Sequence, residues 1–95
     1  MAAYRRLLTS LIEAHKKYPV AARRMRQEGS CQRAVILSRD GGLKGVETLS
    51  SCGHDSLDQA ATGAIRAVGN YPPFPAELSL HEARFNVTIT FGLSR

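Results

Sequence analysis

The first 17 residues place apolar side chains at steps of three and four, the spacing of one face of an α-helix. We therefore predict a helix over about Tyr4–Lys17. The Tyr18-Pro19 pair ends it, because a residue before proline is pushed out of the helical region, and Pro19 suits the first turn of a new helix. This second helix should reach about Gln27, with Gly29 as its end. The stripe of the first helix is Tyr4, Leu7, Leu8, Leu11, Ile12 and His15.

From Gly29 the period changes to two, as in a strand with one buried face. Cys31, Val35 and Leu37 fall on that face, and Arg33 shares it as a misfit. The run Asp40-Gly41-Gly42 predicts a hairpin turn, because these residues tolerate positive φ. A second strand is expected over about Leu43–Ser51, with Val46 and Thr48 on its inner face.

Gly53 breaks the second strand, and Asp55 or Ser56 then provides the N-cap of a third helix. Gly69-Asn70 ends this helix, and the proline-rich run 71–75 predicts a rigid extended crossover. The last strand alternates most clearly in the chain. The helix stripe is Leu57, Ala60, Ala61, Ala64, Ile65 and Val68; the strand has Phe85, Val87, Ile89, Phe91 and Leu93 on one face and Asn86, Thr88, Thr90 and Gly92 on the other.

Three strands with one apolar face each need cover, and three amphipathic helices supply it. We therefore predict a two-layer α+β domain, with a three-stranded antiparallel sheet packed against helices in the order α-α-β-β-α-β. A chain of 95 residues fits a single domain. Within it, residues 1–17 form an added N-terminal helix and residues 18–95 the core domain.

The basic residues are concentrated at the start of the chain. The net charge is +5 and the isoelectric point about 9.8. Up to residue 26 only Glu13 opposes seven basic side chains. Either these residues cover the solvated face of helices, or they form a docking face for a negatively charged partner. The seven are Arg5, Arg6, Lys16, Lys17, Arg23, Arg24 and Arg26.

A nucleic-acid-binding module is a rival function that this charge allows. It would bind with a steep dependence on salt. The basic residues are not interleaved with aromatic side chains, and the outer face of the predicted sheet lacks the aromatic pair of RNA-reading sheets. We therefore expect no nucleic-acid partner.

Membrane crossing is not expected from this sequence. No apolar run approaches the ~18 residues that a spanning helix needs. The start of the chain also lacks a signal-peptide pattern and leads directly into an amphipathic segment. We expect either a cytosolic chain or a piece of a longer exported protein.

Catalytic and metal-binding patterns are weak. Cys31, Cys52 and His54 lack a fourth ligand and the usual zinc spacing. Cys52 and His54 are too close in sequence to set a base against a thiol, and His54 fits a turn cap better. No phosphate-loop motif and no paired-carboxylate signature is present. We therefore predict a non-enzyme without a metal or cofactor.

Several short motifs follow one another in an order that resembles the C-terminal domain of TonB energy transducers. No single motif is specific, but their order and spacing across residues 18–93 make the resemblance strong. Cys31, Arg33 and Cys52 depart from the family pattern. The motifs are Tyr18-Pro19-Val20-Ala21-Ala22-Arg23-Arg24, Glu28-Gly29, Asp40-Gly41, Val46, Ser51-Cys52-Gly53-His54, Leu57-Asp58-Gln59-Ala60-Ala61 and Pro72-Pro73-Phe74-Pro75.

The resemblance implies a mechanical role in the periplasm. TonB-like proteins have an inner-membrane anchor and a proline-rich linker, and their C-terminal domain transmits energy from the ExbB–ExbD motor to outer-membrane transporters. This chain resembles that periplasmic domain alone. The transported substrate, whether siderophore, haem or cobalamin, stays open. A related alternative is the C-terminal domain of TolA, which serves other envelope proteins.

The resemblance also implies a binding site. In the family the Ton box of the transporter adds as a strand to the last strand of the domain. A purely structural role is the other interpretation, in which the strand only contributes its apolar face to the core; the two roles are compatible. Exposed edges also allow a homodimer of the isolated domain. The strand is Arg84, Phe85, Asn86, Val87, Thr88, Ile89, Thr90 and Phe91; Arg23, Arg24 and Arg26 are candidates for pairing with acidic groups of the transporter.

Cys31 and Cys52 are placed by the hairpin. If the chain turns at Gly41-Gly42, facing residue numbers sum to about 83, which sets the two cysteines opposite each other. The oxidising periplasm, implied by the resemblance, favours a disulfide. Two reduced, buried cysteines are the alternative.

Overall fold

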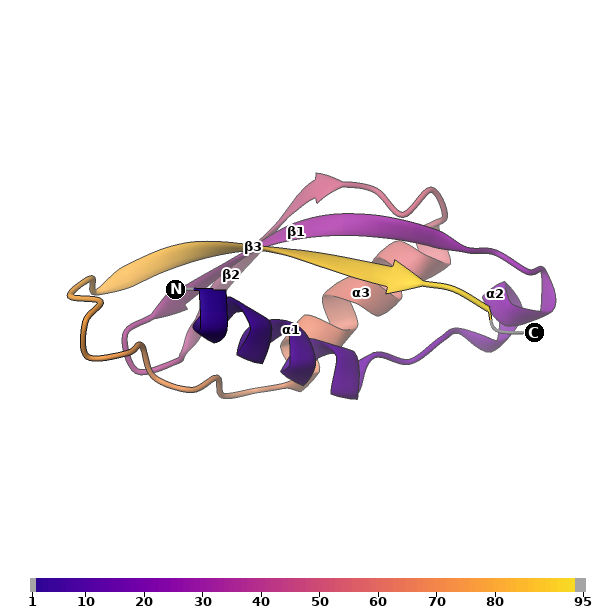
Figure 1. The fold of residues 1–95 in the computed structure, drawn as a ribbon. Coiled ribbons are helices and arrows are strands. Elements are labelled where there is room, and N and C mark those ends of the chain that lie inside the picture. The colour runs from indigo at the N-terminus through magenta and orange to yellow at the C-terminus, as the bar shows by residue number, and fades with distance from the viewer. Residues whose placement is uncertain (1, 94–95) are drawn as a thin grey trace.

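The computed structural model describes residues 2–93. Three helices and three strands follow in the predicted order, and the sheet is antiparallel with strand order β2-β1-β3, which confirms the predicted fold class. The elements are α1 (Ala2–His15), α2 (Val20–Arg24), β1 (Gly29–Ser38), β2 (Leu43–Ser50), α3 (Asp55–Ala67) and β3 (Glu82–Phe91) (Figure 1).

The helices α1 and α3 lie side by side on one face of the sheet, and no helix of residues 2–93 covers the opposite face (Figure 1). The core lies between these two layers. No helix within residues 2–93 is both long and apolar enough to cross a membrane. The fully buried core side chains include Leu8, Ile12, Val35, Leu37, Leu57, Ile65, Ile89 and Phe91.

Helix α1 is held by one narrow stripe. Tyr4, Leu8 and Ile12 are buried, while Leu7 is 44% exposed. The Tyr4 ring packs against the rings of Phe74 and Phe85, and its hydroxyl donates to the Pro72 carbonyl at 2.6 Å. The helix ends at His15, two residues before the predicted end.

The crossover before β3 is extended, as expected from its prolines. The amide of Tyr71 donates to the Gly41 carbonyl and the amide of Phe74 to the Arg39 carbonyl, at 3.0 and 2.9 Å. The buried Tyr71 hydroxyl donates to the Ile65 carbonyl at 2.7 Å. Burial raises the pKa of Tyr71 to about 12, so the phenol stays protonated and keeps this bond.

The hairpin register predicted from the turn alone is wrong. Val35 faces Val46, not Thr48, because the pairing of β1 with β2 shifts at two irregularities. Thr48 does lie on the predicted inner face, because its partner Arg33 on β1 points to the helices. Val46 packs partly buried against the core, but Thr48 is exposed, because α3 covers little of β2. The shifts, between Gln32 and Arg33 and between Ile36 and Leu37, each change the pairing.

The N-cap of α3 is His54, so the prediction of Asp55 or Ser56 is wrong. His54 has an extended backbone, its carbonyl accepts the Asp58 amide at 3.0 Å, and its side chain makes no capping bond. The acidic residues instead lie inside the first turn, where a negative charge complements the positive end of the helix.

The helix α2 is shorter than predicted, and Arg26 rather than Gly29 ends it. Arg26 has a φ of 54° and is the one non-glycine residue with positive φ among residues 2–93. The Arg26 amide donates to the Arg23 carbonyl and the Gln27 amide to the Ala22 carbonyl, at 3.1 and 2.8 Å. These two bonds make a Schellman motif with arginine in the place that glycine usually occupies.

Replacing Arg26 by glycine is therefore expected to stabilise the domain by about 1 kcal/mol, because glycine adopts this backbone without steric cost. Chemical denaturation measures the change. The matched control is Arg24→Gly, inside α2, which should destabilise by a similar amount because glycine is a poor helix former. A destabilised Arg26→Gly variant would contradict this interpretation of the helix end.

Candidate partner-binding edge

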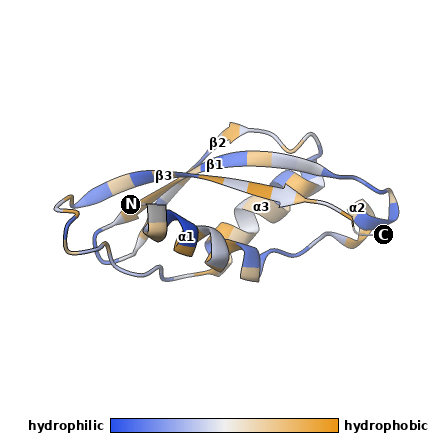
Figure 2. Cartoon of the chain, viewed as in Figure 1, coloured by the Kyte–Doolittle hydropathy of each residue, from blue (hydrophilic) through white to orange (hydrophobic). Residues whose placement is uncertain are grey.

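Strand β3 buries one face and exposes the other. Residues alternate strictly along Arg84–Phe91, with the odd-numbered side chains in the core and the even-numbered ones in solvent. The hydropathy of the residues changes along this strand (Figure 2). The buried set is Phe85, Val87, Ile89 and Phe91, and the exposed set is Arg84, Asn86, Thr88 and Thr90. The predicted strand is thus both part of the core and exposed on one side.

The position of β3 leaves one of its long edges open. It pairs with β1 without a break, from Gly29 opposite Phe91 to Ser38 opposite Glu82. Within residues 2–93, no strand pairs with its other edge, since β3 is the last strand in the order β2-β1-β3. The open edge is a place where a further strand can add.

The hydrogen bonds at the strand ends fix which backbone groups face this edge. Ser38 donates its amide to the Gly42 carbonyl, toward β2, and Arg39 donates to His81, toward β3. Because backbone groups alternate along a strand, odd residues of β1 bond β3. By the register, the odd residues of β3 bond β1. The outward N–H and C=O groups therefore belong to Arg84, Asn86, Thr88 and Thr90.

The eight residues Arg84–Phe91, predicted to bind the partner strand, thus divide into two sets with different roles. The four outward residues present backbone donors and acceptors as well as exposed side chains. The four inward residues hold β3 on the sheet through β1 and the core. Such a division gives a rigid edge on which backbone pairing needs few side-chain contacts.

Lys16 lies at one end of this edge, which the sequence did not indicate. Its ammonium donates to the Thr90 carbonyl and to the Glu13 carboxylate, the latter at 2.9 Å. It also lies 5.2 Å from the centre of the Phe91 ring. The Thr90 contact agrees with the outward direction of that carbonyl. A lysine beyond the end of a helix had no sequence signal that tied it to a strand 74 residues away.

The arginine cluster Arg23, Arg24 and Arg26 lies near the same end. Together with Leu93, which follows β3, the three side chains line a polar hollow of about 230 Å³. Arg23 also stacks over the Tyr18 ring, with 5.3 Å between its guanidinium carbon and the ring centre. Figure 1 shows the segment that follows β3 running toward α2. The structure thus places the three arginines near the Phe91 end of the predicted strand.

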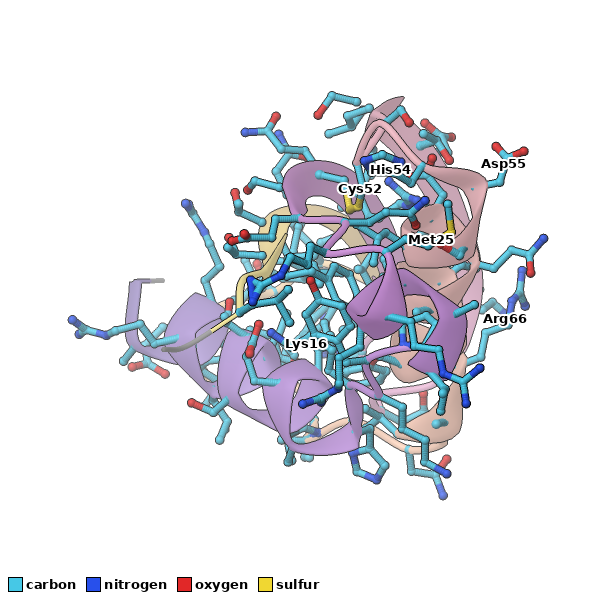
Figure 3. The ribbon with its side chains drawn as sticks, turned by 90° about the vertical axis from the view of Figure 1, so that its right-hand side faces the viewer. Lys16, Met25, Cys52, His54, Asp55 and Arg66 are labelled. Atoms are coloured by element: carbon cyan, nitrogen blue, oxygen red, sulfur yellow. A yellow bond between two sulfur atoms is a disulfide. The ribbon has the colours of Figure 1, made fainter. Side chains whose placement is uncertain are left out.

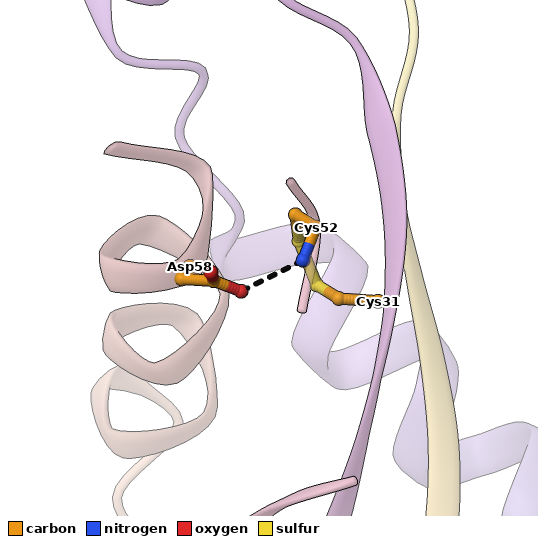
Figure 4. Close-up of side chains that lie close together, drawn as sticks. All are labelled: Cys31, Cys52 and Asp58. Atoms are coloured by element: carbon orange, nitrogen blue, oxygen red, sulfur yellow. Dashed lines mark hydrogen bonds between the residues drawn. A yellow bond between two sulfur atoms is a disulfide. The ribbon is translucent and has the colours of Figure 1, made fainter. Parts of the chain in front are cut away.

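Cys31 and Cys52 form a disulfide between β1 and the loop after β2 (Figure 4). Cys52 lies past the last residue pair of the hairpin. Gly29 allows this close approach, because a Cβ at Gly29 would lie 2.1 Å from the Cys52 carbonyl oxygen. Asp58, rather than His54, lies beside the two sulfurs. Disulfide sulfurs are not thiolates, so this group does not offer the ligands that zinc requires.

Arg33, the misfit of the first strand, is buried with only 1% of its surface exposed. Its five N–H bonds all have acceptors. Two go to Asp58, one of them to the carboxylate at 2.9 Å. The others go to the Thr62 hydroxyl and to the carbonyls of Gln32 and Ser50. A buried charge with complete pairing is structural, and Arg33 replaces apolar packing with a polar network.

Asp58 is the centre of that network. The Ser51 hydroxyl donates to its Oδ2 at 2.5 Å and the Cys52 amide to its Oδ1 at 2.9 Å. The Ser51 hydrogen bond, followed by those of the Cys52 amide and Arg33, holds the pKa of Asp58 below its usual value, against the opposing effect of desolvation.

Other charged side chains of α3 lie outside this network. Asp55 and Arg66 are exposed and point away from the domain (Figure 3).

Comparisons with known proteins agree with this architecture. The family model described as Gram-negative bacterial TonB protein C-terminal matches residues 14–93. The Protein TonB of Haemophilus influenzae is 42% identical over 84 residues, which are 84% of this chain and 31% of that protein. The chain thus spans about a third of the length of that relative.

Solved structures show the same fold. The C-terminal domain of Helicobacter pylori TonB matches with a TM-score of 0.84 and 20% identity, over 100% of this chain and 85% of that one. A structure of TolAIII bound to a peptide derived from the N-terminus of TolB matches with a TM-score of 0.68 and 24% identity, over 96% and 75%. At these identities the likeness concerns the fold alone.

Proposed function

The chain belongs to the family of Gram-negative bacterial TonB protein C-terminal domains, and from this premise we propose that it binds outer-membrane transporters in the periplasm. The bound element is the Ton box, which adds as a fourth strand along Arg84–Phe91. The observation that carries the proposal is the open edge of β3 with its four outward residues.

In this proposal the domain is the distal part of an energy transducer. An inner-membrane anchor and the ExbB–ExbD motor would act through a longer protein, and the domain would pass force to the transporter during active uptake. Backbone pairing suits this role, because one edge serves several receptors with different side chains. Arg23, Arg24 and Arg26 would add long-range attraction to acidic groups of the transporter.

A TolA-like role is the second candidate. The fold resembles that of TolAIII, which was solved bound to a peptide derived from the N-terminus of TolB. In this second proposal, a peptide from another envelope protein would add to the edge of β3. The two candidates share strand addition and differ in the partner. The experiment below separates them by the peptide that binds.

The test is a titration of the isotope-labelled domain with a Ton-box peptide from a transporter encoded in the same genome, followed by NMR. Saturable shifts along residues 84–93 are expected. Shifts confined to Arg23, Arg24 and Arg26 would indicate charge docking without strand addition. An absence of shifts at millimolar peptide, with shifts from a TolB-derived peptide instead, would favour the TolA-like role.

Thr88→Pro is expected to weaken peptide binding at least tenfold, because proline removes an outward N–H and places its ring at the edge. Thr48→Pro is the matched control. Thr48 faces Arg33, so by the same alternation its backbone points out from the opposite edge of the sheet. That variant should bind within about twofold of the unmodified domain. Equal losses in both variants would contradict binding at β3.

A further inference from the structure

Lys16 already donates a hydrogen bond to a backbone carbonyl that an added strand would need as an acceptor. The Thr90 carbonyl faces outward at the end of β3, and an added strand that reaches this residue would donate an amide to it. In the structure the Lys16 ammonium already donates there. A strand that pairs with Thr90 therefore displaces Lys16, and a displaced ammonium needs another acceptor because losing a partner carries a cost.

The surroundings of Lys16 decide which acceptor fits. An ammonium has three donors, and in residues 2–93 the acceptors of Lys16 are Thr90 and Glu13. One donor is thus available, and a second becomes so when Thr90 is paired. The side chain is 20% exposed, so an interaction here is screened less than at an open surface.

The charge of this end of the domain also favours an acidic group. Residues 13–28 contain five basic side chains and two acidic ones. The arginine hollow beside Leu93 continues the positive surface beyond the strand. At the other end of β3, the basic Arg39 donates to the Leu80 carbonyl and the basic Arg84 pairs with Glu47 at 2.7 Å, so these charges and the acidic Glu82 leave no basic excess comparable to that of residues 13–28. The edge is thus basic at one end only.

We propose that Lys16 selects an added strand that carries a carboxylate at the Thr90 end of the edge; this inference rests on the proposed function. The strand amide takes the Thr90 carbonyl and the strand carboxylate takes the released ammonium. Lys16 lies over Phe91, on the helix-covered face of the sheet. Cross-strand neighbours share a face, so the acidic residue lies opposite Ile89 or Phe91, not opposite Thr90.

Lys16 is therefore a specificity residue for one position of the partner. It fixes where along the edge the partner's acidic side chain lies, and so it sets the register of a strand that backbone pairing alone would leave free to slip. If the acidic residue of the added strand is replaced by glutamine, the backbone of that strand still pairs with the edge. The amide oxygen of glutamine is, however, a weaker acceptor for the Lys16 ammonium than a carboxylate.

The test uses synthetic Ton-box peptides from the transporter of the same genome. Their native acidic residues are changed to glutamine, and one glutamate is then moved along the peptide. Dissociation constants are measured at low ionic strength on the unmodified domain and on Lys16→Met, Lys16→Arg and Lys17→Met. Methionine keeps the apolar stem over Phe91, arginine keeps the charge, and Lys17 is the exposed neighbour that serves as control.

At one position, or at two positions spaced by two, glutamate should bind about three- to fivefold more tightly than glutamine. Lys16→Met should reduce this ratio to about one, while Lys16→Arg and Lys17→Met keep it. A ratio of about one at every position overturns the inference, as does a ratio that survives in Lys16→Met, which would assign the selection to the arginine cluster. If peptides bind and Thr88→Pro blocks them, only the inference on Lys16 has failed; if no peptide binds β3, both have failed.

Discussion

Asp58→Asn is expected to destabilise the domain by about 3 kcal/mol, because removing one partner of a buried ion pair leaves an uncompensated charge. That charge belongs to Arg33, which is almost completely buried. Asparagine keeps the size of the side chain and an acceptor for the Cys52 amide, so the change tests the charge rather than the packing.

Arg33→Met should lower the free energy of unfolding by less, about 1–2 kcal/mol, because the Asp58 carboxylate that remains keeps other hydrogen-bond partners. Asp58 is 25% exposed and still accepts bonds from Ser51 and Cys52 after the arginine is gone. Urea denaturation of the two single variants and of the double variant measures both effects and their coupling. Asp55→Asn, an exposed acid in the same helix turn, is the control. A smaller loss for Asp58→Asn than for Arg33→Met would contradict this account.

The pH dependence gives an independent check on Asp58. A carboxyl whose pKa is lower in the folded state stabilises that state above its unfolded pKa, and this contribution is lost as the pH falls through the folded pKa. The unmodified domain should therefore lose stability from about pH 5 downward, beyond what other acids contribute. The difference in stability between it and Asp58→Asn should narrow over the same range, because protonation discharges the same group.

The main elements of the fold could be predicted because they rest on local patterns. The alternation along Phe85–Phe91 indicated a strand with one buried face, and the step of three and four in Tyr4–Ile12 indicated a helix. Arg33 could not be explained in this way. Its acceptors come from the neighbouring strand and from α3, so its burial depends on contacts that no local pattern encodes.

The candidate site also depends on long-range contacts that local sequence patterns do not reveal. The alternation and the family resemblance predict Arg84–Phe91 as the partner-binding strand, but the direction of its backbone groups needs the register with β1. The contact between Lys16 and Thr90 joins residues far apart in the chain. The end of α2 also misled the prediction, because Arg26 adopts a backbone in which glycine is the usual signal.

Loss of the disulfide is the second large effect that we expect. Replacing Cys31 and Cys52 together by alanine should destabilise the domain by about 3 kcal/mol, because a cross-link that closes a loop of this length restricts the unfolded chain. The two residues are 21 apart in sequence. Since Cys31 pairs with Ile89, the change also weakens the part of β1 that holds the end of β3.

Denaturation with and without a reductant separates the cross-link from the side chains. The unmodified domain should lose about as much stability in reductant as the double variant loses by mutation, because both then lack the same loop closure. The double variant should not respond to reductant. Mass spectrometry of the domain purified from the periplasm, without reduction, should find no free thiol. Two free thiols, or equal stability with and without reductant, would show that the cysteines are buried side chains and that the fold does not depend on their bond.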